Sequence, residues 1–166
     1  RNVELRGEAF FRVKKGTRFS VESRQGTVTV LGTEFTVKDR ENYYEVSCYS
    51  GSVKVSAGER STVLKPGLAF RIVEGKEENY SFAGNAGKGW LQGESSFRSV
   101  PLRYVISELE RQYKIKVETP GVDMTQLFTG SFSHENLEIA LKSITLPLHL
   151  HYEMKDKIIV ISIEGN

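Results

Sequence analysis

The sequence has 166 residues, of which 39% are apolar and 27% are charged, and its formal net charge is +2. These values are typical of an ordinary globular chain that can bury a core. They exclude a membrane-spanning helix, which needs an apolar run of ~20 residues, and neither half of the chain has the basic density of a nucleic-acid-binding protein. The chain opens on an arginine instead of a methionine, so we expect a fragment or a processed product.

Short strands account for the first part of the chain. From Val3 to Val13, apolar residues alternate with charged ones, which is the period of a half-buried strand. Similar runs follow, separated by glycine-containing turns about every ten residues. Gly32 lies where the alternation changes parity, so we expect a β-bulge or a tight corner there. Residues 1–75 are therefore predicted to form an all-β domain, either a sandwich or jelly-roll-like array or a short solenoid.

The periodic pattern stops after this domain. Residues 76–89 are rich in Gly, Glu, Asn and Lys, which predicts a linker. Trp90 follows, and we expect its ring to dock on one of the two domains. Residues 90–166 are predicted to form the second domain.

The second domain contains an internal repeat. Apolar positions recur with an offset of 35 residues (132 − 97 = 35), so that Phe97 corresponds to Phe132 and Leu109 to Ile144. Within each copy the apolar spacing changes from a lone aromatic residue to i, i+3, i+4, i+7 and then to alternation. This order predicts a strand, an amphipathic helix and a strand, twice over.

The two predicted helices are apolar on more than one side. Tyr104 and Ile139 occupy equivalent positions in the repeat, and both lie opposite the main apolar stripe. A helix of this kind usually packs between two layers. We therefore expect an α+β domain of tandem β-α-β units, with both helices between two small sheets.

Candidate chemical groups are few and isolated. Cys48 is the single cysteine, which excludes an internal disulfide and a Cys-based zinc site, and its place in a strand pattern predicts a buried thiol. His149 and His151 share one side of a predicted strand, but the polar face of a strand explains them more simply than half a metal site. His134 lies at a predicted helix start, where we expect it to be solvated. Because no nucleophile–base pair, paired carboxylates or phosphate loop is visible, we expect no catalytic residue, metal, cofactor or enzymatic activity.

Several stretches resemble one known family. Residues 1–13 match R-x-V-x-L-x-G-E-A-x-F-x-V, residues 30–37 match V-L-G-T-x-F-x-V, and residues 64–67 match L-x-P-G. These patterns resemble those of FecR-type anti-sigma regulators. Residues 90–161, including the run 127–132, are similar to the C-terminal domain of the Bacteroidetes members, which is related to the short N-terminal domain of secretins and TonB-dependent receptors. The resemblance covers nearly the whole chain in matching order.

This resemblance implies a role in cell-surface signalling. A TonB-dependent outer-membrane receptor would bind its ligand and engage, through its N-terminal signalling domain, the periplasmic region of a single-pass inner-membrane protein. That protein would control an extracytoplasmic-function sigma factor through a cytoplasmic region that, like the membrane span and some further strands, comes before the matching segment in the family. The present sequence would be the periplasmic sensor region. SusC-like glycan importers and iron-complex receptors are equally compatible with it.

Other functions are compatible with the residues. A carbohydrate-binding β-sandwich with an accessory domain would need a platform of exposed aromatic rings, for which Phe10, Tyr43 and Tyr49 are candidates scattered along the sequence. A hydrolase with an unrecognised site and a ring-forming component of a secretion system are the two further alternatives.

The last strand is the predicted partner-binding segment. No later strand in the sequence can cover Lys157, Ile158, Ile159, Val160 and Ile161, and an unpaired edge is a template for strand addition by a partner. Their apolar side chains alternate onto both faces. We therefore expect this strand or its neighbour to form the receptor-contacting edge. The alternative is a central strand that the domain itself buries.

Overall fold

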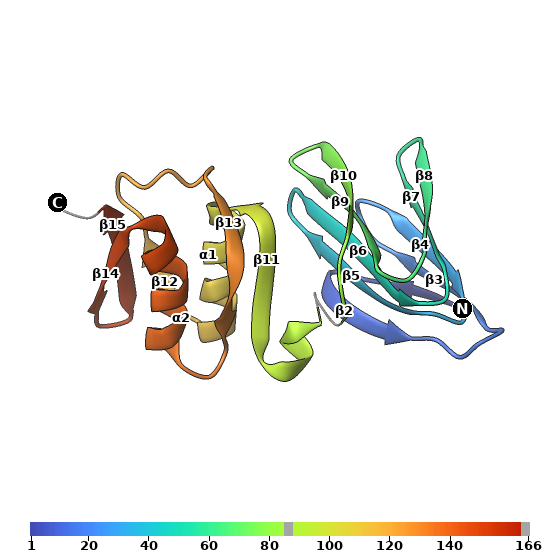
Figure 1. Cartoon of the computed structure of the whole chain (residues 1–166), viewed down its shortest axis with the longest axis horizontal. Coiled ribbons are helices and arrows are strands. Elements are labelled where there is room, and N and C mark those ends of the chain that lie inside the picture. Colours follow the sequence, from blue (N-terminus) through green and yellow to red (C-terminus); the bar gives the residue numbers. More distant parts are fainter. Residues whose placement is uncertain (85–87, 164–166) are drawn as a thin grey trace. The chain divides into compact units, whose positions relative to one another are not determined.

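The chain folds as two compact units, residues 1–88 and 89–166, in a computed structural model that describes residues 1–84 and 88–163 (Figure 1). Among the described residues, unit 1 (residues 1–88) is built from strands, and both α-helices belong to unit 2 (residues 89–166). The expected docking of the Trp90 ring lies outside what the structure describes.

Unit 1 is a sandwich of two five-stranded sheets. Sheet A has the strand order β1-β3-β4-β7-β8, and sheet B has the order β10-β9-β6-β5-β2. Neighbouring strands are antiparallel except for β1 and β3, which are parallel. The strands are β1 (Asn2–Glu4), β2 (Gly7–Arg12), β3 (Arg18–Glu22), β4 (Thr27–Leu31), β5 (Glu34–Arg40), β6 (Tyr43–Ser50), β7 (Val53–Ala57), β8 (Arg60–Leu64), β9 (Leu68–Val73) and β10 (Lys76–Ser81).

One apolar core lies between the two sheets. Alternate residues of the strands point inward, as the period-two pattern requires. The core members are Val21, Val28, Val30, Phe35, Val37, Tyr44, Val46, Cys48, Val53, Val55, Ala57, Leu64 and Phe70. The prediction of an all-β domain is confirmed, and of the alternatives left open the structure has the sandwich.

Gly32 turns the chain from one sheet to the other. It follows β4 of sheet A and precedes β5 of sheet B, and its φ of +83° lies in the left-handed region that favours glycine. A Cβ atom at this position would approach the Cα of Lys15 to 2.2 Å. The tight corner predicted from the parity change is therefore present, and the space there admits only glycine.

The segment predicted to be a linker is partly a strand. Lys76–Ser81 form β10, which pairs with β9 over six positions, from Lys76 opposite Val73 to Ser81 opposite Leu68. The first unit therefore ends at residue 88 instead of residue 75. The sequence KEENYS has little apolar character because β10 is an edge strand, and backbone pairing to a single neighbour requires no apolar alternation.

The new boundary predicts a difference between two fragments. Residues 1–75 should melt at a temperature at least ~5 °C below residues 1–88, because removal of β10 exposes the edge of β9 and leaves Arg71 without its Glu78 partner. Thermal denaturation followed by circular dichroism measures both values. Equal melting temperatures would show that β10 is not part of the unit.

Unit 2 repeats a strand–helix–strand pattern and adds one last strand. Its elements are η1 (Gly89–Gln92), β11 (Glu94–Pro101), α1 (Leu102–Tyr113), β12 (Lys116–Glu118), β13 (Leu127–Ser133), α2 (Leu137–Thr145), η2 (Leu146–Leu148), β14 (Leu150–Lys155) and β15 (Ile158–Ile163). The first copy is β11-α1-β12 and the second is β13-α2-β14, as the offset of the apolar positions predicts. Strand β15 belongs to neither copy.

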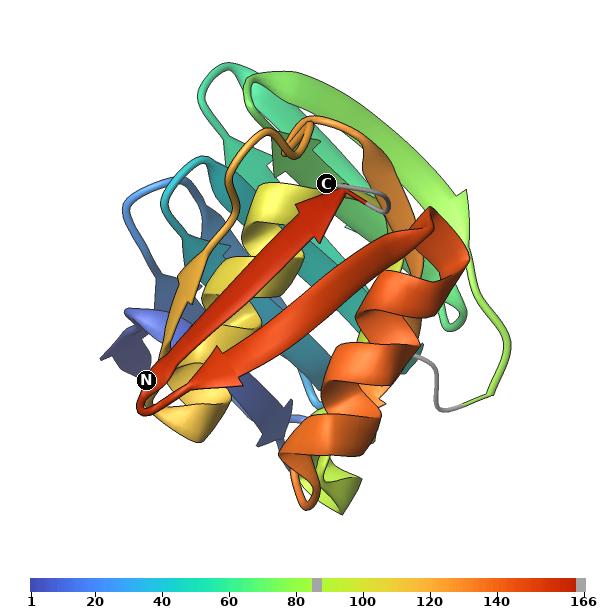
Figure 2. The same ribbon diagram turned by 90° about the vertical axis from the view of Figure 1, so that its left-hand side faces the viewer.

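The two helices of unit 2 lie between two small sheets, as predicted (Figures 1 and 2). One sheet pairs β11 with β13, and the other has the order β12-β15-β14. Phe97 and Phe132, at equivalent repeat positions, stack with their ring centroids 5.9 Å apart. The reasoning from Ile139 is wrong, however: its side chain is 55% exposed, so it does not pack against a second layer.

Candidate partner-binding surface

The predicted partner-binding strand is the central strand of its sheet. Strand β15 pairs in parallel with β12 through Ile158–Val160, and in antiparallel fashion with β14 along its whole length. Ile159 and Ile161 are buried, Val160 is half-buried, Ile158 is 37% exposed, and Lys157 is exposed in the turn before the strand. The expectation that this strand is an uncovered edge is therefore wrong. Its apolar sequence reflects a place between two neighbouring strands.

The edges of this sheet are β12 and β14. Strand β12 has three residues, which gives little template for another strand, whereas β14 has six residues and pairs on one side with β15. Strand addition needs a run of unpaired N–H and C=O groups along one side of a strand. The neighbour β14 meets this requirement better than any strand paired on both sides.

The outward face of the three-stranded sheet is mixed in chemistry. Because Ile159 and Ile161 face the helices, their register partners on β14 point inward and the intervening residues point outward. The outward residues of β15 and β12 include Ile158, Val160, Lys116 and Glu118, and those of β14 are His151, Glu153 and Lys155. An apolar stripe on β15 is thus flanked by charged side chains on both neighbouring strands.

The histidine pair considered for a metal site is not a pair. His149 caps η2 in the left-handed conformation, with φ of +55°, and β14 begins one residue later. Only His151 is therefore in the strand. Within residues 1–84 and 88–163, no group of three or more His, Cys, Asp or Glu side chains is arranged to hold a metal ion.

His134 also differs from its prediction. Its Nε2 atom lies 2.6 Å from the Oγ of Ser95, a buried residue on β11, and its ring lies against Phe132. In a nucleophilic site, a histidine acts as the base that activates a neighbouring serine. Such a site also needs a third group that orients the histidine. No carboxylate hydrogen-bonds to His134 among the residues that the structure describes, so the contact ties the loop that precedes α2 to β11.

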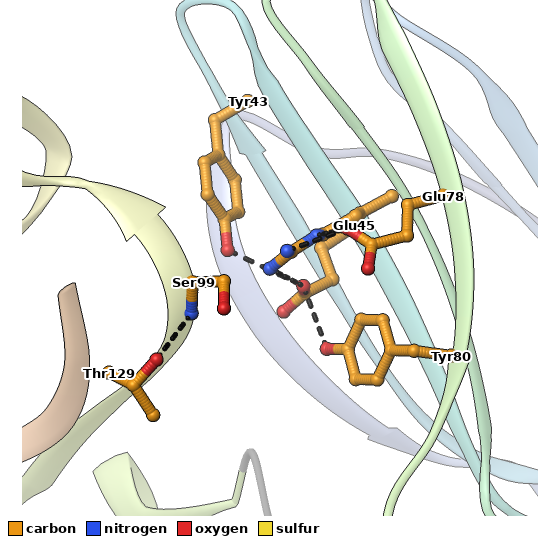
Figure 3. A network of polar contacts seen from close by, with 7 residues as sticks. Tyr43, Glu45, Glu78, Tyr80, Ser99 and Thr129 are labelled. Carbon is orange, nitrogen blue, oxygen red and sulfur yellow. Dashed lines mark hydrogen bonds and ion pairs between the residues drawn. The ribbon is translucent and has the colours of Figure 1, made fainter. Parts of the chain in front are cut away.

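The sheet of β11 and β13 carries a distortion on β11. The register shifts between Phe97 and Val100, and Ser99 adopts a φ of +46° at this bulge. The backbone N–H of Ser99 donates to the Oγ1 of Thr129 on β13 at 2.9 Å (Figure 3). A side-chain acceptor therefore replaces the regular ladder at this point, and it allows Val100 to return to the buried face.

In unit 1, two of the three aromatic residues considered for sugar binding meet on the outward face of sheet B, whereas the third, Tyr43, is buried. Phe10 and Tyr49 meet edge to face with centroids 6.2 Å apart, and the Nζ atom of Lys88 lies 4.8 Å and 4.2 Å from the two centroids. The Nζ atom of Lys38 lies 5.0 Å from the ring centroid of Tyr43. Ammonium groups thus occupy one face of each ring, and tilted rings do not make a flat platform, which disfavours sugar stacking here.

A polar network ties three strands of sheet B together (Figure 3). The Nη2 atom of Arg71 on β9 lies 2.7 Å from a carboxylate oxygen of Glu78 on β10. The hydroxyl of Tyr80 donates to Glu45 on β6 at 2.8 Å, and Nη1 of Arg71 lies 3.9 Å from the same carboxylate. Burial and the charge of Glu45 raise the pKa of Tyr80, so its hydroxyl remains a donor. These contacts give the network a structural role.

The thiol of Cys48 lies in the core of the sandwich, as predicted. It is 0% exposed, and its Sγ atom contacts the carbonyl oxygen of Ser50 at 3.5 Å. Burial raises the pKa of the Cys48 thiol to about 11.

This environment predicts an inert thiol. Relative to its ordinary pKa of 9.0, a value of about 11 lowers the thiolate fraction near neutral pH by roughly a hundredfold, and the thiolate is the reactive form. Ellman's reagent should therefore not modify Cys48 in the native chain at about pH 8, but should modify it fully after denaturation. Rapid modification of the folded protein would contradict this burial.

Comparisons with known proteins agree with the two units. The model of the FecR protein family matches residues 1–54, and that of the FecR C-terminal domain matches residues 94–161. Two crystal structures from Parabacteroides distasonis ATCC 8503, each of a provisionally named anti-sigma factor, are 30% identical to this chain. They have TM-scores of 0.90 and 0.91, and each match covers 99% of this chain and 81% of the other. No functionally curated protein matches.

These matches define the class of the protein as an anti-sigma regulator. The chain belongs to the FecR family, of which it contains both the FecR domain and the C-terminal domain. Within the described ranges, neither helix is long and apolar enough to cross a membrane.

Proposed function

We propose that this chain is the periplasmic sensor region of a transmembrane anti-sigma factor. It receives a signal from the N-terminal signalling domain of a TonB-dependent outer-membrane receptor and controls an extracytoplasmic-function sigma factor. The sigma factor is reached through the cytoplasmic region that precedes this segment in the family. Membership of the FecR family is the observation that carries the proposal, since that family is regulatory.

The receptor contact is assigned in this proposal to unit 2. Its three-stranded sheet has an edge strand of six residues, β14, and strand addition is a common way in which small domains bind extended partners. The outward side chains of Ile158 and Val160 lie beside β14 and add apolar contact area. Of the five residues predicted from the sequence, these two are the ones retained as side-chain contacts.

A pull-down tests the proposal. The immobilised chain is offered the purified signalling domains of the TonB-dependent receptors from the same cell, SusC-like and iron-complex types alike. At least one domain should be retained, and residues 89–166 alone should retain the same one. Retention of none of them would remove the basis for a receptor-linked function.

A proline scan of β14 predicts two classes of variant. In an antiparallel edge strand, the N–H groups of alternate residues point to the paired side and to the unpaired side. Proline therefore removes a hydrogen bond to β15 at every second position of β14, and at the positions between it removes an N–H group that a partner strand could use. Proline variants at His151, Tyr152, Glu153 and Met154 should fall into two alternating pairs. The pair whose N–H groups bond to β15 should unfold unit 2. The other pair should stay folded and bind the receptor domain at least ~10-fold more weakly.

Two controls accompany the scan. Ile159→Pro should unfold unit 2, because β15 is paired on both sides, and it calibrates the loss of structure in thermal melts. Glu153→Ala should leave binding unchanged if the backbone of β14 carries the contact. Wild-type affinity in every folded proline variant would exclude strand addition at this edge.

A further inference from the structure

The outward face of sheet A has a shallow hollow whose charged lining residues are all basic. Its volume is about 710 Å³, and residues of β3, β4, β7 and β8 with their adjoining turns line it. Four lining residues are basic, and none is acidic or aromatic: Lys15, Arg18, Lys54 and Lys65. We refer to this feature as the basic hollow.

Strand register explains why these side chains meet. Val30 and Val53 are register partners that point into the core, so the next pair along the two strands, Thr29 and Lys54, points outward. Lys54 is in turn the partner of Val63 on β8. The hollow therefore extends across several strands. The residues next to Thr29, Lys54 and Val63 in the sequence point the other way, into the core.

Two apolar side chains lie among the cations. Leu31 is 64% exposed and Val63 is 52% exposed, although both are in strands whose other apolar residues are mostly buried. A single exposed leucine is ordinary on a protein surface. Here both exposed residues line the same hollow as the four basic groups, so that one surface combines apolar and positively charged side chains.

The basic groups of the hollow are not neutralised by carboxylates. Elsewhere in unit 1, Arg12 pairs with Glu34 and Arg60 with Glu77, each at 3.0 Å. None of the four basic residues forms an ion pair within the part of the chain that the structure describes. Clustered like charges repel one another and create a positive potential that attracts an anionic partner.

We propose that the basic hollow binds an extended acidic peptide segment that carries apolar residues among its carboxylates. Its carboxylates would pair with Lys15, Arg18, Lys54 and Lys65, and its apolar side chains would cover Leu31 and Val63. The hollow offers a sugar chain no aromatic platform, and a free phosphate or polyphosphate has no apolar group that could cover Leu31 and Val63. This interaction is separate from the receptor contact proposed for unit 2.

Fluorescence anisotropy tests the proposal with a short fluorescein-labelled peptide of glutamates interrupted by two leucines. The folded chain should bind it, and Lys54→Glu should weaken binding about tenfold, since reversal of one central charge removes about 1.4 kcal/mol. Lys76→Glu is the matched control, because Lys76 is an exposed strand lysine of the same unit but lies on sheet B. It should leave the affinity nearly unchanged.

A second variant separates a peptide site from a general anion site. Leu31→Ser should also weaken binding several-fold, while its circular dichroism melt stays close to that of the wild type. An unchanged affinity for Leu31→Ser, equal losses for Lys54→Glu and Lys76→Glu, or no binding of the peptide at all would overturn the proposal. Tighter binding to phosphatidylglycerol vesicles or to inorganic polyphosphate than to the peptide would overturn it as well.

Discussion

Leu109→Ala and Ile144→Ala should each lower the free energy of unfolding of unit 2 by about 2–5 kcal/mol. The two residues occupy equivalent repeat positions on α1 and α2, and both are 0% exposed. Truncation to alanine removes apolar contacts and leaves a cavity between the two sheets, which closely packed surroundings refill only in part. Chemical denaturation of residues 89–166, followed by circular dichroism, measures both changes.

The matched control is Ile139→Ala on α2. Because this side chain is 55% exposed, its truncation should change the stability by less than about 0.5 kcal/mol. Near-wild-type stability for Leu109→Ala and Ile144→Ala, or a large loss for Ile139→Ala, would contradict the burial of the first two side chains and the exposure of the third.

Gly32→Ala should destabilise unit 1 by about 3 kcal/mol or more. Alanine at a φ of +83° carries a conformational penalty of roughly 1–2 kcal/mol, and its Cβ would stand 2.2 Å from the Cα of Lys15. The contacted atom is backbone, so the corner between sheets A and B must shift to make room. The midpoint of urea denaturation of residues 1–88 measures the loss.

Gly58→Ala separates the two causes of this loss. Gly58 has a φ of +61°, but no atom lies within 4 Å of a Cβ built at this position. Its substitution should therefore show the conformational penalty alone, about 1–2 kcal/mol. Equal effects at Gly32 and Gly58 would show that the close approach to Lys15 does not constrain the corner.

Much of the fold could be predicted because its signals are local. Alternation identifies the strands of the sandwich, and the 35-residue offset identifies both β-α-β copies (132 − 97 = 35). The choice of a sandwich could not be made from this pattern, because it depends on pairings between distant strands, such as β4 with β7 and the parallel pair of β1 and β3. The edge strand β10 has no apolar alternation that could predict it, because it needs only backbone hydrogen bonds to β9.

The candidate sites are harder to predict, because strand order and register determine which distant residues come together in them. The position of β15 at the end of the sequence suggests an edge strand with one unpaired side. That side is paired in parallel with β12, which precedes β15 by about forty residues, and a parallel pairing over such a distance leaves no local signal in the sequence. Phe10 and Tyr49 are also distant in sequence and meet only through the order of strands in sheet B. The basic hollow draws on four strands, so no window of the sequence could show it.

The most direct test of the central claim is isothermal titration calorimetry with the signalling domain of the receptor that the pull-down identifies. The whole chain should bind it with a single-site isotherm, and residues 89–166 alone should keep the affinity within about threefold. A parallel titration with glycans tests the carbohydrate-binding alternative and should give no heat of binding. Heat from a glycan together with none from any receptor signalling domain would contradict the signalling function.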